Sequence, residues 1–322
     1  MDLEEFLAEW YNDSPTVLVR TSGSTGKPKP MFVEKRRMEA SAHVTCQFLG
    51  LKSGDTALLC MSLDYIAGKM MVVRSLTCGL KLTMVEPCGC PSWEGTVDFA
   101  AMVPMQVYNL LQSAEGRERL MAVKHLIIGG GAIDEAMARE LKTFPNAVWS
   151  TYGMTETLSH IALRRLSGAE ASEWYLPFEG VTLSLTDEGC LVINAPAVHD
   201  GPLVTNDIAE LSDKGFRILG RKDNVICSGG IKIQIEEVER MLRPHAPVPF
   251  MITKCADKKF GEQVVLLTES QNMDVIKDVC RGVLPKYWQP RSYVQVDQLP
   301  MTETGKPARK EAERLAALSI EV

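Results

Sequence analysis

Residues 16–29 read TVLVRTSGSTGKPK, in which an apolar, β-rich run passes directly into a loop of glycines and hydroxyls. A strand that leads into such a loop is typical of α/β domains, where ligands bind beyond the carboxyl ends of the strands. Glycines let the backbone approach a ligand closely, and hydroxyls with exposed backbone N–H groups can donate to phosphate oxygens. A Ser/Gly loop without a ligand is the alternative. The residues of this candidate phosphate loop are Thr21, Ser22, Gly23, Ser24, Thr25, Gly26 and Lys29.

The spacing of this loop differs from that of P-loop nucleotide-binding proteins. Their motif has four residues between its first glycine and the Gly-Lys-Ser/Thr that ends it. Here two residues separate Gly23 from Gly26, and Pro28 follows Lys27. The sequence therefore disfavours a P-loop kinase or ATPase.

Short apolar runs alternate with helical patterns through the rest of the first half of the chain. This alternation predicts βαβ units and hence an α/β fold with a mainly parallel sheet flanked by helices. The predicted strands cover 56–61, 81–86, 123–128 and 147–150, and the predicted helices cover 36–49, 66–78, 105–113 and 133–143.

The pattern changes between residues 175 and 221, where two hairpins are predicted around Asp187-Glu188-Gly189 and Asp213-Lys214-Gly215. We expect them to form an antiparallel β piece on the first domain. The remainder predicts a smaller α+β domain, so that the expected domains are 1–221 and 222–322. Its predicted helices cover 235–242, 273–284 and 307–318, and its predicted strands cover 248–254 and 264–269.

Composition limits the classes of function. The chain has 322 residues, enough for about two domains, and its 35 basic and 41 acidic residues give a net charge of −6. Without a basic excess, nucleic acid is not an expected partner. No apolar run reaches about 18 residues, so no transmembrane span is expected. The acidic N-terminus is unlike a signal peptide. The number of cysteines, nine, is odd, which indicates reduced thiols and a cytoplasmic location.

The loop at 21–29 resembles the phosphate loop of the adenylate-forming superfamily, which includes acyl-CoA synthetases, luciferases and peptide-synthetase adenylation domains. The family pattern is T-S-G-[ST]-T-G-x-P-K-G, and Pro30 replaces its last glycine. Further segments resemble the family's other motifs in the same order, so the resemblance extends from residue 21 to residue 309. Relatives carry a sizeable region before this loop, whereas only 20 residues precede it here. The chain is either a naturally compact enzyme or a fragment. A capping box expected at Asp2 and Glu5 is typical of a true chain start, which favours the compact enzyme.

Two segments that follow predicted strands resemble nucleotide-binding motifs of the family. Gly129-Gly130-Gly131 matches its adenine-facing glycines, although an ordinary β-to-α turn is the alternative. The segment from Tyr152 and Gly153 to Thr155 and Glu156 matches Y-G-x-T-E. The resemblance implies that Tyr152 stacks on adenine, that Thr155 bonds the α-phosphate and that Glu156 helps to hold Mg²⁺, a cation that prefers carboxylate and phosphate oxygens.

Two segments near the domain boundary resemble the ribose-binding and hinge motifs. Asp207 lies in Thr205-Asn206-Asp207, where the family has T-G-D, and is implied to bind the ribose hydroxyls. Gly220-Arg221-Lys222-Asp223 matches G-R-x-D. Arg221 is implied to contact ribose or phosphate, and Lys222 and Asp223 are implied to form the hinge.

The last two motifs lie in the expected C-terminal domain. Ser228, Gly229 and Gly230 match the segment that approaches the pantetheine arm of CoA. The stretch 300–309 fits P-x-T-x-x-G-K-x-x-R, which makes Lys306 the implied catalytic lysine, although a lysine in a tail is otherwise a solvated surface group. In relatives the small domain swings between two half-reactions, so we expect a mobile C-terminal domain here.

The resemblance implies an AMP-forming acid–CoA ligase that uses ATP, Mg²⁺ and coenzyme A, with a small carboxylic acid as its other partner. The regions 63–76 and 223–239 most resemble o-succinylbenzoate–CoA ligases of menaquinone biosynthesis, although Tyr65 stands where that family has histidine. A dicarboxylate would need a second cationic or polar contact. The candidate acyl-site residues are Tyr65, Arg74, Ser159 and His160, with a helix-surface arginine and a structural histidine as the alternatives for Arg74 and His160.

Two other functions stay open at this point. An adenylating enzyme that hands its acyl group to a carrier protein or another thiol would make no CoA thioester. A non-catalytic nucleotide-binding protein would bind ATP without pyrophosphate exchange, but such a protein has no need for both Glu156 and Lys306.

Overall fold

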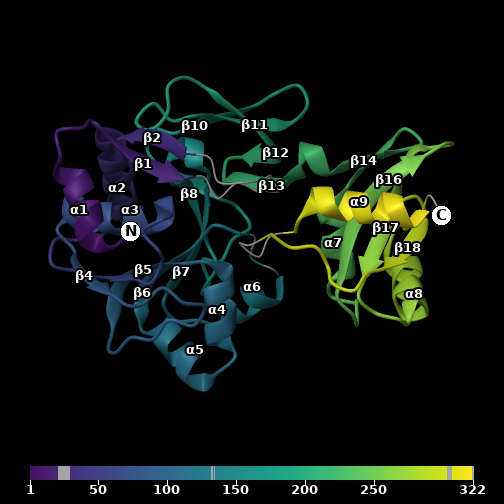
Figure 1. The fold of residues 1–322 in the computed structure, drawn as a ribbon, viewed down its shortest axis with the longest axis horizontal. Coiled ribbons are helices and arrows are strands. Elements are labelled where there is room, and N and C mark those ends of the chain that lie inside the picture. The colour runs from purple at the N-terminus through teal and green to yellow at the C-terminus, as the bar shows by residue number, and fades with distance from the viewer. Residues whose placement is uncertain (21–29, 132, 134, 303–306, 321–322) are drawn as a thin grey trace. The chain divides into compact units, whose positions relative to one another are not determined.

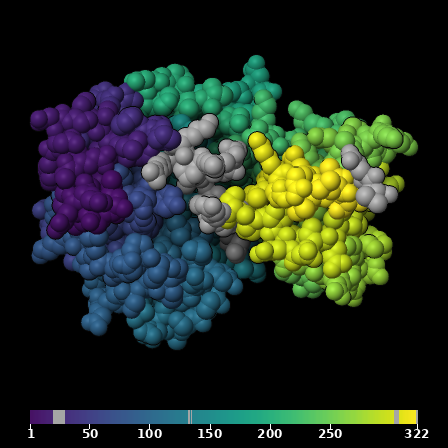
Figure 2. Space-filling view, in the orientation of Figure 1, coloured from purple at the N-terminus to yellow at the C-terminus, as the bar shows by residue number. Residues whose placement is uncertain are grey.

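The computed structural model describes residues 1–20, 30–131, 133, 135–302 and 307–320. The chain divides into two compact units, which Figure 1 shows as ribbons and Figure 2 as surfaces. The first unit comprises Met1–Ser184, Val192–Leu203 and Leu211–Arg217, and the second comprises Leu185–Leu191, Val204–Glu210 and Ile218–Val322. Among the described residues, no helix is long and apolar enough to cross a membrane.

A seven-stranded sheet forms the centre of the first unit, in the order β4-β3-β5-β6-β7-β8-β9. Neighbours from β4 to β7 are parallel, and β8 and β9 extend the sheet in antiparallel fashion. The predicted α/β class with a mainly parallel sheet is thereby confirmed. The strands are β3 (Thr56–Leu59), β4 (Lys81–Met84), β5 (Val97–Met102), β6 (Val123–Ile128), β7 (Ala147–Gly153), β8 (His160–Arg165) and β9 (Leu176–Pro177).

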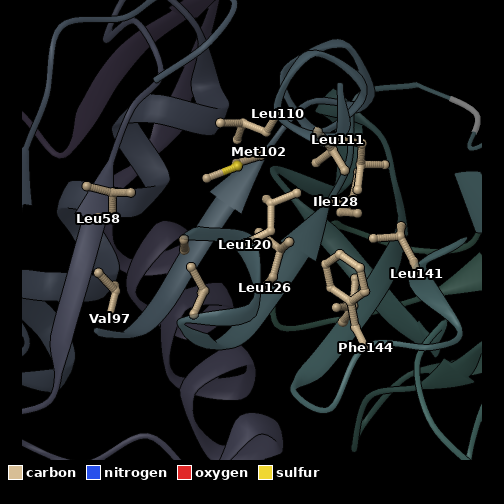
Figure 3. Packing of buried hydrophobic residues seen from close by; sticks show 14 of the residues in the cluster. Leu58, Val97, Met102, Leu110, Leu111, Leu120, Leu126, Ile128, Leu141 and Phe144 are labelled. Atoms are coloured by element: carbon tan, nitrogen blue, oxygen red, sulfur yellow. The ribbon is translucent and has the colours of Figure 1, made fainter. Parts of the chain in front are cut away.

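Helices α4, α5 and α6 cover one face of this sheet. Figure 3 shows buried side chains of β3, β5 and β6 that meet side chains from these helices, among them Leu58, Leu110, Leu120, Leu126 and Leu141. Helix α3 packs against α2 and against β3. The helices are α2 (Lys35–Leu49), α3 (Ile66–Cys78), α4 (Pro104–Leu111), α5 (Ala114–Met121) and α6 (Glu135–Leu141).

A separate hairpin and the first helix complete the N-terminal part. Strands β1 (Thr16–Arg20) and β2 (Pro30–Glu34) are antiparallel, with Arg20 opposite Pro30. Helix α1 (Leu3–Tyr11) begins with the predicted capping box, because the Asp2 carboxylate accepts the Glu5 N–H and the Glu5 carboxylate accepts the Asp2 N–H. The ends of β1 and β2 therefore lie side by side and flank residues 21–29.

The two predicted hairpins form one antiparallel sheet in the order β10-β11-β12-β13. Their turns contain Gly189 and Gly215, whose positive φ angles of 81° and 117° favour glycine. The strands are β10 (Thr182–Leu185), β11 (Cys190–Asn194), β12 (Leu203–Ser212) and β13 (Gly215–Arg221).

The C-terminal part of the second unit is an α+β layer structure. Its sheet has the order β15-β14-β17-β16, with β18 paired to β17. Ile252 packs with α7 and α8 on one face, whereas its neighbour Met251 packs with α9 on the other, as strand periodicity requires. The elements are β14 (Val225–Ser228), β15 (Ile231–Gln234), α7 (Ile235–Leu242), β16 (Phe250–Asp257), β17 (Gly261–Thr268), α8 (Met273–Val283), β18 (Ser292–Gln295) and α9 (Arg309–Ile320).

Candidate active site

Two of the predicted nucleotide-binding segments lie together at the carboxyl ends of neighbouring strands of the parallel sheet. Strands β6 and β7 are parallel neighbours, with Ile128 opposite Ser150, and both motifs follow their carboxyl ends. The Gly129–Gly131 turn follows β6, and Gly130 has a φ of 80°. Gly153 closes β7, where a Cβ would lie 2.2 Å from the Ser159 carbonyl oxygen. The structure thus brings Gly130 and Gly131 to the same edge as the Y-G-x-T-E segment.

Two aromatic rings that the sequence analysis missed hold the Tyr152 ring. The Phe216 ring meets it edge-on at 5.1 Å between centroids, and the Tyr175 ring lies 5.8 Å away. The Tyr175 hydroxyl is 2.9 Å from Ser150 Oγ, and a bridge joins the Tyr175 and Phe216 backbones. These contacts fix the plane of the Tyr152 ring, which suits a ring that stacks on a flat base.

The turn that carries Thr155 and Glu156 is shaped by buried Thr157. Its hydroxyl accepts the Met154 N–H at 3.1 Å, and its single proton is shared between the carbonyl oxygens of Met154 and Ser159, at 3.0 and 2.8 Å. The short helix η1 (Thr155–Thr157) ends at Leu158, whose φ of 64° is unusual for a residue with a side chain. This turn leaves the Glu156 carboxylate exposed beyond the end of β7.

The exposed Glu156 carboxylate fits a magnesium ion that reaches the protein bound to phosphate. Mg²⁺ is commonly held by one or two carboxylates together with substrate phosphates and water, rather than by a cage of protein ligands. The described residues contain no cluster of three or more His, Cys, Asp or Glu side chains that could hold a metal ion. A single exposed carboxylate such as that of Glu156 is a ligand of the first kind.

Arg74 is buried in α3, so the interpretation as a helix-surface arginine is wrong. Its residue is 2% exposed, and its Nη2 donates to Ser159 Oγ at 2.8 Å. Burial lowers the pKa of Arg74 to about 10. Within the described part of the chain its Nε is buried without a hydrogen-bond partner, and no carboxylate forms an ion pair with it. An uncompensated buried cation is costly, and an anionic ligand would relieve that cost.

A chain of hydrogen bonds continues from Arg74 through Ser159 to His160 and Thr45. Ser159 Oγ lies 3.2 Å from His160 Nδ1, and Thr45 Oγ1 lies 3.1 Å from His160 Nε2. Because the Thr45 hydroxyl donates to the Ser41 carbonyl oxygen at 3.0 Å, it accepts from His160 Nε2–H. His160 Nδ1 is then the acceptor for the Ser159 hydroxyl, which itself accepts from Arg74.

This chain assigns a neutral His160 with its proton on Nε2. Burial, and secondarily the nearby Arg74 cation, hold the pKa of His160 well below its usual value. The structure therefore joins three of the four predicted acyl-site residues, and the backbone of Ser159 links them to the Thr157 turn. Tyr65, the fourth, is 43% exposed at the N-cap of α3 and takes no part in this chain of bonds.

In the second unit, the predicted ribose and hinge residues form one polar cluster. Arg221 Nη1 donates to Asp207 Oδ1 at 3.2 Å, and its Nη2 donates to Asp223 Oδ2 at 3.0 Å. Asn206 Nδ2 also donates to Asp223 Oδ2, at 3.3 Å. The short helix η2 (Lys222–Asn224) holds both hinge residues, and Lys222 pairs with Glu188.

Ser228, Gly229 and Gly230 form the turn between β14 and β15. Gly229 and Gly230 have φ angles of 57° and 83°, so this tight turn favours glycine at both positions. A Cβ on Gly229 would meet the Phe260 ring at 3.0 Å, and the Gly229 N–H donates to the Phe260 carbonyl oxygen. The turn is thereby fixed against the β16–β17 loop.

Eight of the predicted site residues lie outside the described residues: Thr21, Ser22, Gly23, Ser24, Thr25, Gly26, Lys29 and Lys306. The described residues on either side of both segments are paired through their backbones. Arg20 and Pro30 are paired at the end of the β1–β2 hairpin. A bridge between Met301 and Pro307, with a bond from the Ala308 N–H to the Pro300 carbonyl oxygen, joins the two sides of residues 303–306.

Comparisons with known proteins agree with this arrangement. A family model described as AMP-binding enzyme matches residues 5–197. The 2-succinylbenzoate–CoA ligase of Bacillus mycoides is 24% identical over 355 aligned residues, which cover 97% of this chain and 73% of that protein. An acyl-CoA synthetase (AMP-forming)/AMP-acid ligase II-like protein from Dyadobacter fermentans has a solved structure that is 31% identical, with a TM-score of 0.66, and the match covers 95% of this chain and 91% of that one.

A third match, to a solved structure of low sequence identity, shows similarity of fold alone. The o-succinylbenzoate CoA synthetase of Bacillus subtilis, solved in complex with its acyl-adenylate intermediate, is 23% identical, with a TM-score of 0.75 over 92% of this chain and 68% of that one. The family model, by contrast, covers more than half of the chain and includes the Y-G-x-T-E turn. The chain accordingly belongs to the AMP-binding enzyme family, among its AMP-forming acyl-CoA synthetases.

Proposed function

We propose that this protein joins a dicarboxylic aryl acid to coenzyme A at the expense of ATP, with o-succinylbenzoate as the acid, a reaction of menaquinone biosynthesis. The observation that carries the choice of acid is the buried Arg74 guanidinium, which has no carboxylate partner among the described residues. The alternative acceptors, a carrier protein or another thiol, are distinguished by the experiment that closes this subsection.

In the first half-reaction, a carboxylate oxygen of the acid attacks the α-phosphorus of ATP, and the bond to pyrophosphate breaks. Catalysis of this step consists of positioning and charge stabilisation. The segment 21–29 would bind the leaving pyrophosphate, Lys306 would offset negative charge at the reacting oxygens, and Thr155 would bond the α-phosphate. Glu156 would hold Mg²⁺, which supplies neutralisation of the phosphate charge when bound.

The remaining nucleotide contacts would come from the glycine turn after β6, from Tyr152, and from Asp207 and Arg221. Tyr152, whose ring plane is fixed by Phe216 and Tyr175, would stack on adenine beside Gly130 and Gly131. Asp207 would accept hydrogen bonds from the ribose hydroxyls. Arg221 already donates to Asp207, so it would orient that carboxylate while contacting the ribose or a phosphate.

In the second half-reaction, the CoA thiol attacks the acyl carbon of the adenylate, and AMP leaves. We assign 1–221 as the adenylation domain and 222–322 as the domain that changes position between the two halves. Lys222 and Asp223 would absorb the change in backbone angles, as a few residues do in other hinged proteins. Lys306 would then leave the site, and Ser228, Gly229 and Gly230 would meet the pantetheine arm.

The second carboxylate of the acid would bind at Arg74. Ser159 Oγ accepts from Arg74 Nη2, and neutral His160 orients the Ser159 hydroxyl, while Arg74 Nε has no hydrogen-bond partner among the described residues. A guanidinium matches a carboxylate in shape and charge. This arrangement favours a dicarboxylate over an acid that has a neutral group at the same place.

The test is a comparison of two acids that differ by one carboxylate. The protein is incubated with ATP, Mg²⁺, CoA and either o-succinylbenzoate or 4-oxo-4-phenylbutanoate, which lacks the ring carboxylate, and AMP and acyl-CoA are measured by mass. We expect both products, with kcat/KM at least about tenfold higher for o-succinylbenzoate, equal to ~1.4 kcal/mol. AMP without acyl-CoA would indicate another acceptor, and equal kcat/KM values would contradict the dicarboxylate assignment.

A further inference from the structure

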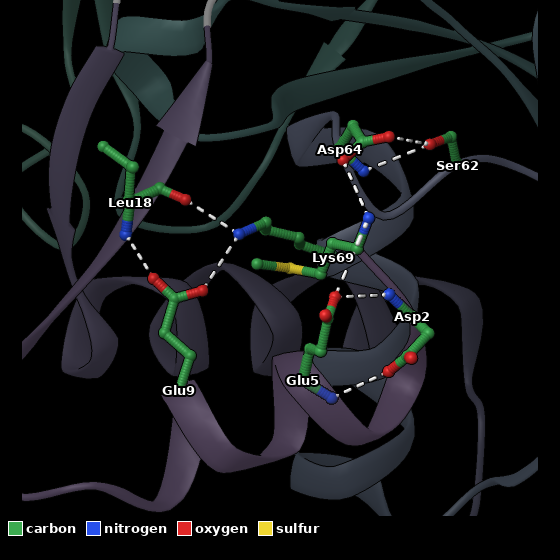
Figure 4. Close-up of polar contacts among 8 residues, drawn as sticks. Asp2, Glu5, Glu9, Leu18, Ser62, Asp64 and Lys69 are labelled. Atoms are coloured by element: carbon green, nitrogen blue, oxygen red, sulfur yellow. Dashed lines mark hydrogen bonds and ion pairs between the residues drawn. The ribbon is translucent and has the colours of Figure 1, made fainter.

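Lys69 is a buried lysine on the same helix as Arg74, and its charge is neutralised by partners from α1 and β1. Its side chain is 3% exposed within α3. Its Nζ donates to Glu9 Oε2 at 3.2 Å and to the Leu18 carbonyl oxygen at 2.8 Å, and it lies 5.2 Å from the centre of the Phe6 ring. Figure 4 shows this ammonium group between α1 and β1. A buried ammonium group is costly without such partners, so the folded protein needs Glu9 and the Leu18 carbonyl oxygen beside Lys69.

Glu9 and Lys69 together occupy both backbone groups of Leu18. Glu9 Oε1 accepts the Leu18 N–H at 2.8 Å, while Lys69 takes the carbonyl oxygen of the same residue. In a strand, the N–H and C=O of one residue point to the same side, so this pair covers the edge of β1 that faces away from β2. Two side chains thus supply the bonds that a neighbouring strand would supply.

Glu9 is itself held in place because α1 is fixed to the rest of the first unit. Phe6 and Trp10 are 0% and 8% exposed, so the apolar face of α1 is buried. The N-terminal ammonium donates to Asp64 Oδ1 at 3.1 Å, next to the start of α3. Figure 2 shows the N-terminal residues packed against the residues that follow in the chain. Glu9 therefore meets β1 from a fixed position.

We propose that Glu9 and Lys69 are positioning residues for ATP binding, because their bonds to Leu18 fix the position of β1, and with it the β1–β2 hairpin, relative to α1 and α3. The inference rests on the proposed function, in which residues 21–29 bind the phosphates of ATP. These residues connect β1 to β2 in the sequence. A strand that slips by one residue turns every side chain to its other face. Loss of the pair would therefore weaken binding of Mg·ATP without changing the acid site around Arg74.

The first measurement is the Kd of Mg·ATP by calorimetry, which does not depend on turnover. Lys69→Met keeps the length of the side chain and removes its donors, whereas Glu9→Gln keeps an acceptor for Leu18 and removes the charge. We expect Kd to rise about tenfold in both variants. Lys69→Arg, which keeps the charge and the donors, should return Kd towards the wild-type value.

Matched controls separate positioning from a general loss of stability. Lys142→Met removes an exposed lysine and should leave Kd unchanged. Leu120→Ala creates a cavity beneath α5, should lower Tm at least as much as Lys69→Met, and should also leave Kd unchanged. If Lys69→Met does not fold, Glu9→Gln gives the same comparison with a milder change.

The outcomes distinguish the inference from the proposed function. A raised KM for ATP, with kcat and the KM of the acid within about twofold of wild type, supports the positioning role. Wild-type Kd values in Lys69→Met and Glu9→Gln, with lowered Tm, would overturn it. A wild-type protein that binds Mg·ATP but makes no acyl-CoA would contradict the proposed function alone, and the Kd comparison would still decide the inference.

Discussion

Arg309 and Glu239 form a bidentate ion pair although 70 residues separate them: Arg309 Nη1 lies 2.6 Å from Glu239 Oε1, and Nη2 lies 2.8 Å from Oε2. Glu239 also accepts the Ile252 N–H, and Arg309 donates to the Ile252 carbonyl oxygen. The pair therefore joins α7 and β16 to the first residue of α9. Arg309 closes the motif that contains Lys306, so this pair fixes the described chain immediately after the implied catalytic lysine.

Removal of Arg309 should destabilise the protein strongly. Glu239 is 5% exposed, and without Arg309 its carboxylate would keep only the Ile252 N–H and the longer contact with Arg243, at 3.7 Å. Breaking a buried ion pair costs about 3–5 kcal/mol, and Arg243 offsets part of that cost. We expect Arg309→Met to lower the free energy of unfolding, measured in urea, by the remainder of that cost. Arg314→Met is the control on the same helix, since its pair with Glu311 is exposed to water and its loss should change the free energy of unfolding far less. Equal losses in the two variants would contradict the importance of the Arg309–Glu239 pair.

Replacement of Arg74 should affect the acid more than the chemistry. Arg74→Met keeps the apolar volume of the side chain and removes the cation that would bind the second carboxylate. We expect KM for o-succinylbenzoate to rise by about 30-fold or more, with kcat changed far less. For 4-oxo-4-phenylbutanoate, steady-state kinetics should give nearly the same KM in both proteins. Unchanged KM for the dicarboxylate would remove Arg74 from the acyl site.

His160 should make the protein less stable in mild acid. Its folded pKa is held well below the unfolded value of about 6.5 by burial and by Arg74, so below pH 6.5 the unfolded chain binds a proton that the folded chain does not. The contribution is fully present above pH 6.5 and is lost as the pH falls towards the folded pKa, by up to about 1.4 kcal/mol per pH unit.

The measurement is the free energy of unfolding at several values between pH 5 and pH 7.5. Burial also lowers the pKa of His125, which acts in the same direction, so wild type is compared with His160→Asn rather than taken alone. The variant should show the smaller loss on acidification. Parallel pH profiles would show that His160 binds its proton equally well in the folded and unfolded chains, and would contradict the neutral His160 that we assign to the folded protein.

Restriction of the hinge should separate the two half-reactions. Proline fixes φ near −65°, so Asp223→Pro should leave adenylation within a few-fold of wild type and slow thioester formation by about 100-fold. Asp223→Ala is the control, because it removes the bonds from Arg221 and Asn206 without restricting the backbone. Single-turnover measurements of pyrophosphate release and of acyl-CoA formation give the two rates. An equal loss in both would refute the hinge assignment.

The sequence predicted most elements but missed some central ones. Strand β5 lies in the middle of the parallel part of the sheet, yet Val97–Met102 was not predicted as a strand. It contains Asp98 and two alanines, which are poor strand formers, and a strand buried on both faces lacks the alternation that marks an exposed one. Its conformation is set by β3 and β6 on either side. Strand β8 and helix α5 were missed as well.

The candidate site divides in the same way. Motifs identified the residues expected to touch ligands, because their spacing along the chain is local. Their supports come from distant parts of the chain: Thr45 meets His160 across 115 residues, and Ser159 meets Arg74 across 85. Thr157, Tyr175 and Phe216 were also missed. No sequence pattern marks such partners, since only the folded sheet brings them together.

Attack of a carboxylate on the α-phosphorus of ATP leaves a record in the products, because one carboxylate oxygen remains on AMP when the thiol displaces it. The most direct measurement is therefore the mass of AMP formed from ¹⁸O-labelled acid in the presence of ATP, Mg²⁺ and CoA. We predict AMP that carries one ¹⁸O atom, together with unlabelled pyrophosphate. Unlabelled AMP, or label in inorganic phosphate with ADP as the other product, would contradict an acyl-adenylate mechanism for this protein.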